Sequence, residues 1–277
     1  MKRAERQGEE YLARGFRDVD AAAVGKMVRC LAYMDGLPEF RQYKNTILEM
    51  MKPQAGSITA DLGCGLGFDV RRLARLVGSE GRSIGVDASL TLIESARAAS
   101  EGFPAVEFIQ GDIQSLPFAS GFLHSCKVDR TLQHVERPDA VLGEIFRTVK
   151  PGGRLVCAEP DWGTFAIKAS SLGNAEHPVA QQVAQLWSQD IRTPRIGRDL
   201  RKLIEETGFV DLQVKETVLS TPTFESSEIV FDITQSALRL AASSGSNEPL
   251  VWLAELRESA NPVCCSVTLV INFARRP

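Results

Sequence analysis

The fold of this chain is decided by nine residues, Asp61-Leu62-Gly63-Cys64-Gly65-Leu66-Gly67-Phe68-Asp69. They follow a short apolar run at 57–60. They precede apolar residues spaced i, i+3, i+4 and i+7, which are Val70, Leu73, Ala74 and Val77. This order predicts a strand, a glycine turn and a helix in succession. Glycines in such a turn let a ligand approach the bare backbone and the N-terminus of the following helix.

A second acidic residue supports a ligand site at this turn. Asp87 ends the next apolar run, Ser83-Ile84-Gly85-Val86. It lies about 20 residues beyond the glycines, where a nucleotide-binding α/β unit holds a ribose. The chain is therefore predicted to bind a cofactor that contains a nucleoside.

Two classes of cofactor fit such a turn. A dinucleotide requires the spacing Gly-x-Gly-x-x-Gly for the close approach of its pyrophosphate, and the third glycine is replaced here by Phe68. Asp61, at the mouth of the first strand, also suits a cation or an ammonium group better than a pyrophosphate. These residues favour a cofactor without a pyrophosphate, and an NAD-dependent oxidoreductase is the alternative.

The segment from Asp61 to Gly67 closely resembles the first motif of class I S-adenosylmethionine (SAM)-dependent methyltransferases. In that family the glycine turn lies under the methionine part of SAM, and the acid that opens the motif helps to hold its amino group. The resemblance implies that Asp87 grips the ribose hydroxyls and that Asp112 faces the adenine amine. By the same resemblance SAM is the cofactor, and the residues that bind it are Asp61, Gly63, Cys64, Gly65, Asp87, Ala88, Asp112, Ile113 and Arg130.

The resemblance extends from about Ile58 to Asp161, and it includes a helix opened by Pro138 and a Pro-Gly-Gly stop at 151–153. It implies an α/β fold with a Rossmann-like sheet of seven strands, the last antiparallel, and helices on both faces. The expected organisation is one compact domain with three parts, which are an N-terminal helical lid at 1–52, a SAM-binding core at 53–160, and acceptor-pocket insertions with the remaining strands at 161–277.

The spacing of apolar residues predicts the elements outside the motif. Two helices are expected before the core, and strand five is expected at 154–158, followed by a connecting segment at 159–165. Later elements are helices at about 175–191, 197–208 and most of 224–260, with strands at 209–214 and 263–273. The insertions at 161–196 and 224–260, together with the lid, are expected to roof the acceptor pocket.

The composition is that of an ordinary globular protein. Of 277 residues, 44% are hydrophobic and 24% are charged, and the net charge of −3 gives no broad electrostatic case for a nucleic-acid partner. The N-terminus lacks the apolar core of a signal peptide, and no apolar run approaches a membrane-spanning length. Six cysteines without a C-x-x-C pair predict reduced thiols in the cytoplasm. We expect neither a metal nor a membrane partner, and the oligomeric state is left open.

Methyl transfer from a sulfonium requires alignment, and it requires a base where the acceptor is a phenol or an alcohol. The best candidate for this base is His134, just past strand four, and its alternative role is to start a helix by bonding the backbone. His124 lies inside a strand and is expected to be structural, whereas His177 is expected at the surface.

Several charged residues fall near the expected methionine and acceptor sites. Arg130 is expected either to bind a carboxylate of cofactor or substrate, or to form a structural ion pair with Asp129 or Glu159. Glu159 and Asp161 end strand five, and they either hold an acceptor amine or cap the following segment.

Residues of the lid and five aromatic side chains also have two interpretations each. Arg41 and Lys44 of the lid reach a carboxylate or, more simply, form a solvated face. An aromatic pocket can draw on residues whose default role is core packing, which are Tyr33, Tyr43, Trp162, Phe165 and Trp187.

The resemblance implies a SAM-dependent methyltransferase that acts on an O, N or C atom of a small organic molecule, because large helical insertions suit an enclosed pocket. It is closest to the bacterial group that contains ubiquinone and menaquinone C-methyltransferases. Amino-group DNA enzymes carry Asn/Asp-Pro-Pro-aromatic after strand four, and Asp129-Arg130-Thr131-Leu132 stands there instead. The remaining alternatives are other chemistry on the same fold, such as that of a cyclase, and a non-catalytic SAM binder.

Overall fold

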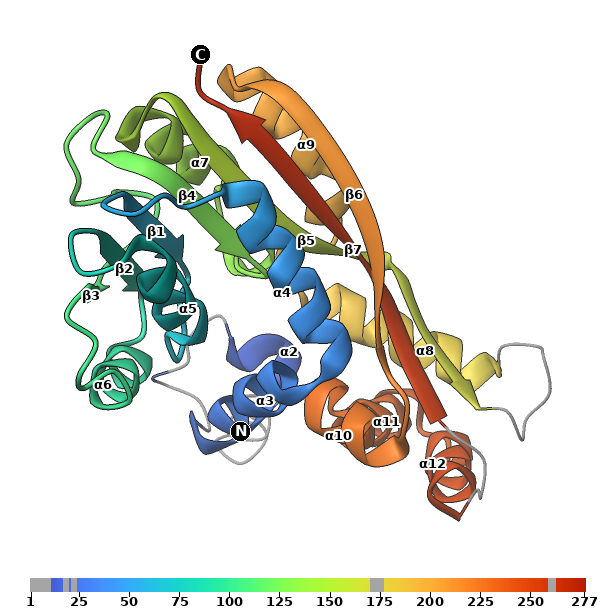
Figure 1. Cartoon of the computed structure of the whole chain (residues 1–277). Helices are drawn as coiled ribbons and strands as arrows, with labels where there is room; N and C mark the ends of the chain where they lie inside the picture. Colours follow the sequence, from blue (N-terminus) through green and yellow to red (C-terminus); the bar gives the residue numbers. More distant parts are fainter. Residues whose placement is uncertain (1–10, 17–19, 21–23, 170–176, 259–262) are drawn as a thin grey trace.

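A computed structural model describes residues 11–16, 20, 24–169, 177–258 and 263–277. Its centre is a seven-stranded sheet with the strand order β3-β2-β1-β4-β5-β7-β6 (Figure 1). β7 is antiparallel to both of its neighbours, and the other adjacent pairs are parallel, which confirms the predicted Rossmann-like α/β fold. The strands are β1 (Ile58–Leu62), β2 (Arg82–Asp87), β3 (Val106–Gln110), β4 (Leu123–Asp129), β5 (Val149–Ala169), β6 (Val210–Thr221) and β7 (Val263–Arg275).

Helices cover both faces of the sheet (Figure 1). Alternate residues of a strand point to opposite faces, and β5 shows this division. Its Val156 joins one core with the lid helix α4, and its Leu155 joins a second core with α7 and α9. The helices are α2 (Leu12–Gly15), α3 (Val24–Gly36), α4 (Pro38–Met51), α5 (Phe68–Val77), α6 (Leu90–Ala98), α7 (Pro138–Thr148), α8 (Pro178–Asp190), α9 (Ile196–Thr207), α10 (Phe224–Phe231), α11 (Ile233–Ser244) and α12 (Glu248–Glu258).

The strand, turn and helix predicted around the nine-residue stretch are present as β1 and α5. All four residues of the predicted apolar stripe are buried, because that face of α5 packs on the sheet. Gly67 precedes the helix with a φ of 69°, and Gly78 ends it with a φ of 70°. Both angles lie in the region that favours glycine, so the two residues set the limits of the helix.

Strands β5 and β6 are longer than the sequence predicted. β5 was expected at 154–158, but it continues to Ala169 past an irregularity between Asp161 and Ala166. The prediction that residues 159–165 form a connecting segment after the strand is therefore wrong. β6 was expected at 209–214 and reaches Thr221. The reason is β7, whose 13 residues offer hydrogen-bonding partners to both strands along most of its length.

His124 and His177 each accept a hydrogen bond from a backbone N–H group. His124 accepts a hydrogen bond from the Ile58 N–H through Nδ1 at 3.1 Å, as expected of a structural residue. His177 is half-buried, caps α8 by accepting from the Val179 N–H at 3.2 Å, and stacks 6.4 Å from the Trp252 ring. His177 is therefore less exposed than a free surface residue, and its ring nitrogen has a structural partner. The expected helix start near Ala175 lies outside the described residues.

Candidate active site

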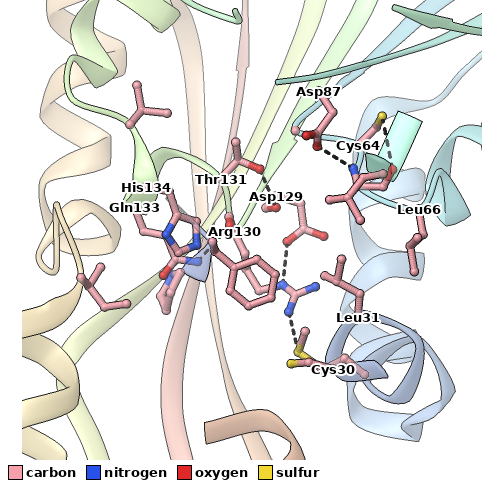
Figure 2. Close-up of a pocket in the computed structure, with 18 of the residues that line it drawn as sticks. Cys30, Leu31, Cys64, Leu66, Asp87, Asp129, Arg130, Thr131, Gln133 and His134 are labelled. Atoms are coloured by element: carbon pink, nitrogen blue, oxygen red, sulfur yellow. Dashed lines mark hydrogen bonds and ion pairs between the residues drawn. The ribbon is translucent and has the colours of Figure 1, made fainter. Parts of the chain in front are cut away.

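A cavity of about 550 Å³ lies at the carboxyl ends of β1, β2 and β4. The N-terminal helices α2, α3 and α4, where the sequence predicts a lid, and the helices α8 and α10 contribute to its walls. In Figure 2, Gln133 and His134 lie on one side of the cavity, opposite Cys64 and Leu66. Every residue predicted to bind SAM lines the cavity, as does the candidate base: Asp61, Gly63, Cys64, Gly65, Asp87, Ala88, Asp112, Ile113, Arg130 and His134.

The glycine turn requires residues without a Cβ atom. Gly63 has a φ of 74°, and an added Cβ would lie 2.2 Å from the Thr131 hydroxyl oxygen. Gly67 has a φ of 69°, and its Cβ would lie 2.5 Å from the Phe108 ring. The turn therefore packs against both β3 and the loop after β4, and the backbone of Gly65 is left at the cavity wall.

The two acids at the ends of β2 and β3 differ in their surroundings. Asp87 accepts hydrogen bonds from the Gly65 N–H at 2.8 Å and the Ser89 N–H at 3.0 Å (Figure 2 shows the former). Burial raises the pKa of Asp87, and these N–H donors oppose that rise. Asp112 is exposed and accepts from the Gln114 N–H at 2.8 Å. Asp87 is thus held rigidly, whereas Asp112 lies at the open edge.

Five buried charged residues form what we call the charged floor of the cavity: Lys44, Asp61, Asp69, Lys127 and Asp129. The Lys127 ammonium lies 3.0 Å from Asp61 and 2.7 Å from Asp69. The Lys44 ammonium, from the lid, lies 2.5 Å from Asp69 and 3.2 Å from Asp129. The simpler interpretation of Lys44 as part of a solvated face is therefore wrong, although Arg41 is exposed.

The charges of the floor stabilise one another. Burial alone would lower the pKa of Lys127, but Asp61 and Asp69 raise it well above its usual value. Burial would likewise raise the pKa of Asp69, but Lys127 and Lys44 hold it well below its usual range. Burial raises the pKa of Asp61, and Lys127 opposes that rise. Lys127 and Asp69 are therefore charged at neutral pH.

Arg130 pairs with Asp129 and not with Glu159. Its Nε lies 3.5 Å from the Asp129 carboxylate, and its guanidinium lies 5.2 Å from the centre of the Phe40 ring (Figure 2 shows Arg130 between Asp129 and the lid). The φ of Arg130 is 51°, an uncommon value for a residue with a side chain. Arg130 lines the cavity, and its Nη1 donates to the Met34 sulfur at 2.8 Å.

Glu159 positions the loop that carries His134. Its carboxylate accepts from the Thr131 N–H at 2.8 Å, the Leu132 N–H at 2.7 Å and the Gln133 N–H at 3.3 Å. It thus caps the short 3₁₀ helix after β4 and not the segment that follows it in sequence. Burial raises its pKa to about 8, against the effect of these N–H donors.

Asp161, expected near the acceptor, has a structural partner instead. Its carboxylate lies 2.9 Å from the Arg198 guanidinium and accepts from the Gly163 N–H at 3.1 Å. Neither Glu159 nor Asp161 is among the residues that line the cavity. The contacts of both acids therefore favour the structural interpretation, in which Glu159 holds backbone N–H groups and Asp161 holds Arg198 and the Gly163 N–H.

His134 ends the 3₁₀ helix Leu132–His134, and its ring lies 5.7 Å from the Phe16 ring of the lid region. The neighbouring Gln133 also lines the cavity, and its Oε1 accepts from the Trp162 Nε1 at 2.6 Å. The sequence did not single out Gln133. The only feature of the sequence that could have identified Gln133 as a cavity residue is its position beside His134, in the loop after β4.

Six other lining residues come from elements that carry no residue of the charged floor, and we call them the aromatic end: Phe16, Trp162, Trp187 and Phe231 with Leu219 and Val267. The rings of Trp162, Trp187 and Phe231 lie 5.8–6.3 Å from one another. The two tryptophans were among the candidates for an aromatic pocket, with core packing as their default role, and the sequence singled out neither phenylalanine. The other three aromatic candidates, Tyr33, Tyr43 and Phe165, are not among the lining residues.

Residues 53–208 match the family model described as a methyltransferase domain. The chain belongs to this methyltransferase family. As the sequence predicted, the protein is an enzyme whose cofactor is SAM. The methyltransferase interpretation is thereby favoured over the cyclase-like and non-catalytic alternatives.

Relatives of this methyltransferase differ in how much of the chain they share. An uncharacterised transposon protein of Streptomyces fradiae is 34% identical over 88% of this chain and 71% of its own length. The demethylmenaquinone methyltransferase of Lactococcus lactis is 31% identical over 62% of this chain and 66% of its own length. A solved Haemonchus contortus phosphoethanolamine N-methyltransferase, bound to S-adenosylhomocysteine (SAH), is 18% identical over 85% of this chain and 52% of its own, with a TM-score of 0.53. The last likeness shows the fold alone.

Within the described residues, every helix is too short or too polar to cross a bilayer. All six cysteines are free thiols, and only Cys264 among them is more than slightly exposed.

Proposed function

We propose that this methyltransferase transfers the methyl group of SAM to a small, largely apolar organic acceptor seated at the aromatic end of the cavity. The observation that carries the proposal is the chemical contrast within one cavity. Buried charges and bare backbone lie at one end, and aromatic rings lie at the other. SAM has a charged amino-acid part and a sulfonium, so it matches the first end, and an apolar ring matches the second.

The cofactor end fits SAM part by part. The charged floor suits the ammonium and carboxylate of the methionine part, with Asp61 and Arg130 as its nearest ligands. Asp87, fixed by two N–H donors, suits the ribose hydroxyls. Asp112 and Ile113 lie on the cavity wall beyond it, as expected for an adenine site. Gly63, Cys64, Gly65 and Ala88 supply backbone between these side chains.

The acceptor is proposed to carry a flat, apolar ring. Trp162 and Trp187 both line the cavity with their ring centres 5.8 Å apart, and their apolar bulk would keep water from that end. The Lactococcus lactis relative is named for demethylmenaquinone, which supports an acceptor of the quinone kind. In this proposal the core at 53–160 mainly holds SAM, while the lid at 1–52 and the insertions at 161–277 enclose the acceptor.

When bound, SAM supplies a methyl group that its sulfonium activates for displacement. The chain's own residues align the acceptor and keep water out. His134, on the cavity wall, accepts the proton of an acceptor hydroxyl at an imidazole nitrogen as that oxygen takes the methyl group. The loop that holds His134 is fixed by Glu159, so the base is pre-positioned.

A labelled-methyl assay tests the proposal. Purified enzyme with methyl-labelled SAM and a panel of hydroxyaromatic and quinol compounds should label at least one acceptor, with one SAH formed per methyl transferred. His134→Ala should keep SAH affinity and lower turnover by about 10²-fold. Full turnover in that variant would remove His134 as the base. SAH binding with no transfer to any acceptor would favour a SAM binder with other chemistry.

The proposal also places the enzyme in the cytoplasm, in line with the sequence. Six free thiols are compatible with a reducing compartment. Fractionation of cells that produce the tagged protein would test this placement, and recovery of the enzyme outside the cytoplasmic fraction would contradict it.

A further inference from the structure

Lys127 is a lysine in the middle of β4, a parallel strand inside the sheet, and its side chain is only 2% exposed. Such strands are normally apolar runs, and an ammonium without partners would be very unfavourable there. Its partners are Asp61 at 3.0 Å and Asp69 at 2.7 Å. Asp61 is also the register partner of Lys127 on β1, so the two side chains lie side by side on one face of the sheet.

The two partners of Lys127 have a special place in the sequence. Asp61 and Asp69 are the first and the last residues of the nine-residue stretch that forms the glycine turn. Asp61 lies on β1, and Asp69 lies in the first turn of α5. One ammonium from β4 therefore binds both ends of the turn and ties together the three elements that surround it.

We propose that Lys127 is a positioning residue of the cofactor site, which holds the glycine turn and the Asp61 carboxylate in the geometry that receives the amino-acid end of SAM. This inference rests on the proposed function, because it requires that end of SAM to lie at the charged floor. The match is electrostatic, since the floor is the part of the cavity where buried charges of both signs meet. Lys127 acts through Asp61 and the turn, and no contact with the reacting atoms is needed.

The two carboxylates depend on Lys127 to different degrees. Asp69 has two further cationic partners, Lys44 at 2.5 Å and Arg72 at 2.6 Å. Within the described part of the chain, Lys127 is the one cation in salt-bridge contact with Asp61. Removing the ammonium should therefore leave Asp69 paired and α5 in place, while Asp61 loses its partner. The effect should be confined to the end of the cavity that Asp61 faces.

The experiment measures the dissociation constants of two ligands by calorimetry, SAH and 5′-methylthioadenosine, which lacks the amino-acid end. Lys127→Met should weaken SAH binding by roughly 10- to 100-fold, the range for a lost charge-assisted hydrogen bond. It should change 5′-methylthioadenosine binding by less than about threefold, because Asp87 and its N–H donors are untouched. In the Lys127→Met background, Asp61→Asn should add little to the loss, because the two residues act as a unit.

Lys26→Met is the matched control. It breaks another lysine–aspartate pair, Lys26 with Asp232 at 2.6 Å, in which the aspartate is buried and the lysine is 24% exposed, and neither residue lines the cavity. Its SAH and 5′-methylthioadenosine affinities should equal those of the wild type. Lys127→Gln, which keeps a donor without the charge, is the second variant if Lys127→Met does not fold. It should lose SAH affinity selectively, but to a smaller extent.

The outcomes separate this inference from the proposed function. If the wild-type protein binds neither ligand, the proposed function fails. If the wild type binds both and the Lys127 variants weaken both equally, or neither, then Lys127 is a structural residue only and the inference is overturned. Additive losses for Asp61→Asn and Lys127→Met would overturn it as well, because Lys127 would then not act through Asp61.

Discussion

The two ends of the cavity are built on different physical principles. The charged floor joins five buried charges through contacts of 2.5–3.2 Å, and most of them come from the sheet and from α5. The aromatic end joins rings at 5.8–6.3 Å from elements far apart in the sequence. Buried charges must have fixed partners, whereas apolar packing is non-directional. The first end is therefore suited to one invariant ligand, and the second can be reshaped for different acceptors.

The largest effect is expected at the glycine turn, where the cofactor end has no room for a side chain. Gly63→Val should abolish detectable SAH binding and destabilise the fold by about 2–5 kcal/mol, because the new Cβ meets Thr131 and the φ of 74° is strained. Calorimetry and urea unfolding would measure both effects. Gly143→Ala, at an open helix position, is the control and should be neutral or slightly stabilising.

Substitution of Asp87 tests whether one fixed carboxylate contributes most of the binding free energy at the ribose site. Asp87→Ala should weaken SAH by about 1.5–3 kcal/mol, or roughly 10- to 150-fold, because it removes an anchored acceptor. Asp112→Ala, at the exposed edge, should cause a smaller loss. Calorimetry would measure the SAH affinity of both variants. Equal losses of affinity would contradict the distinction between the fixed carboxylate of Asp87 and the exposed carboxylate of Asp112.

Glu159, which holds the loop that carries His134, predicts a pH dependence of stability. Its pKa is raised from 4.5 to about 8 by burial, so the folded state holds a proton that the unfolded state loses. This contribution is fully present below pH 4.5 and is lost as the pH rises towards 8, on the order of 1.4 kcal/mol per pH unit. Glu159→Gln should flatten the profile of unfolding free energy between pH 5 and 8. An unchanged slope in urea titrations would show that Glu159 stays ionised.

The smallest effect on the cofactor is expected at the aromatic end. Trp162→Phe removes the hydrogen bond to Gln133 and should lower stability by about 1 kcal/mol. It should raise the KM for the acceptor but leave the Kd of SAH within about twofold, because Trp162 belongs neither to the charged floor nor to the glycine turn. Trp252→Phe, outside the cavity, is the control for the loss of an indole. A large change in SAH affinity in Trp162→Phe would show that the two ends are coupled.

The cofactor end could be predicted from the sequence because its parts are local. The glycines, Asp87 and Asp112 follow strands at fixed spacings, and parallel strands bring their carboxyl ends to one edge of the sheet. His134 and Arg130 follow β4 for the same reason. The sequence also carried a signal that was not used. A lysine inside the strand predicted at 122–128 requires buried acids, and Asp61 and Asp69 supply them.

The aromatic end and the long strands could not be predicted in this way. Phe16 and Phe231 look like ordinary core residues in the sequence, and only the packing of the lid and α10 turns them towards the cavity. Glu159 and Asp161 stand where an acceptor site was expected, but their nearest donors are backbone N–H groups and Arg198. Such partners come from distant segments, so no local spacing reveals them.

By itself the sequence determined the α/β fold, the glycine turn and the acids around it, because these depend on strand and helix periodicity and on residues that only a turn requires. Only the tertiary structure decided how the charges pair and which rings face the acceptor. Lys44 looked solvent-exposed in its helix and lies buried between Asp69 and Asp129. Pairing and burial are properties of side chains that meet across the fold, and their free energy depends on those partners rather than on neighbours in the chain.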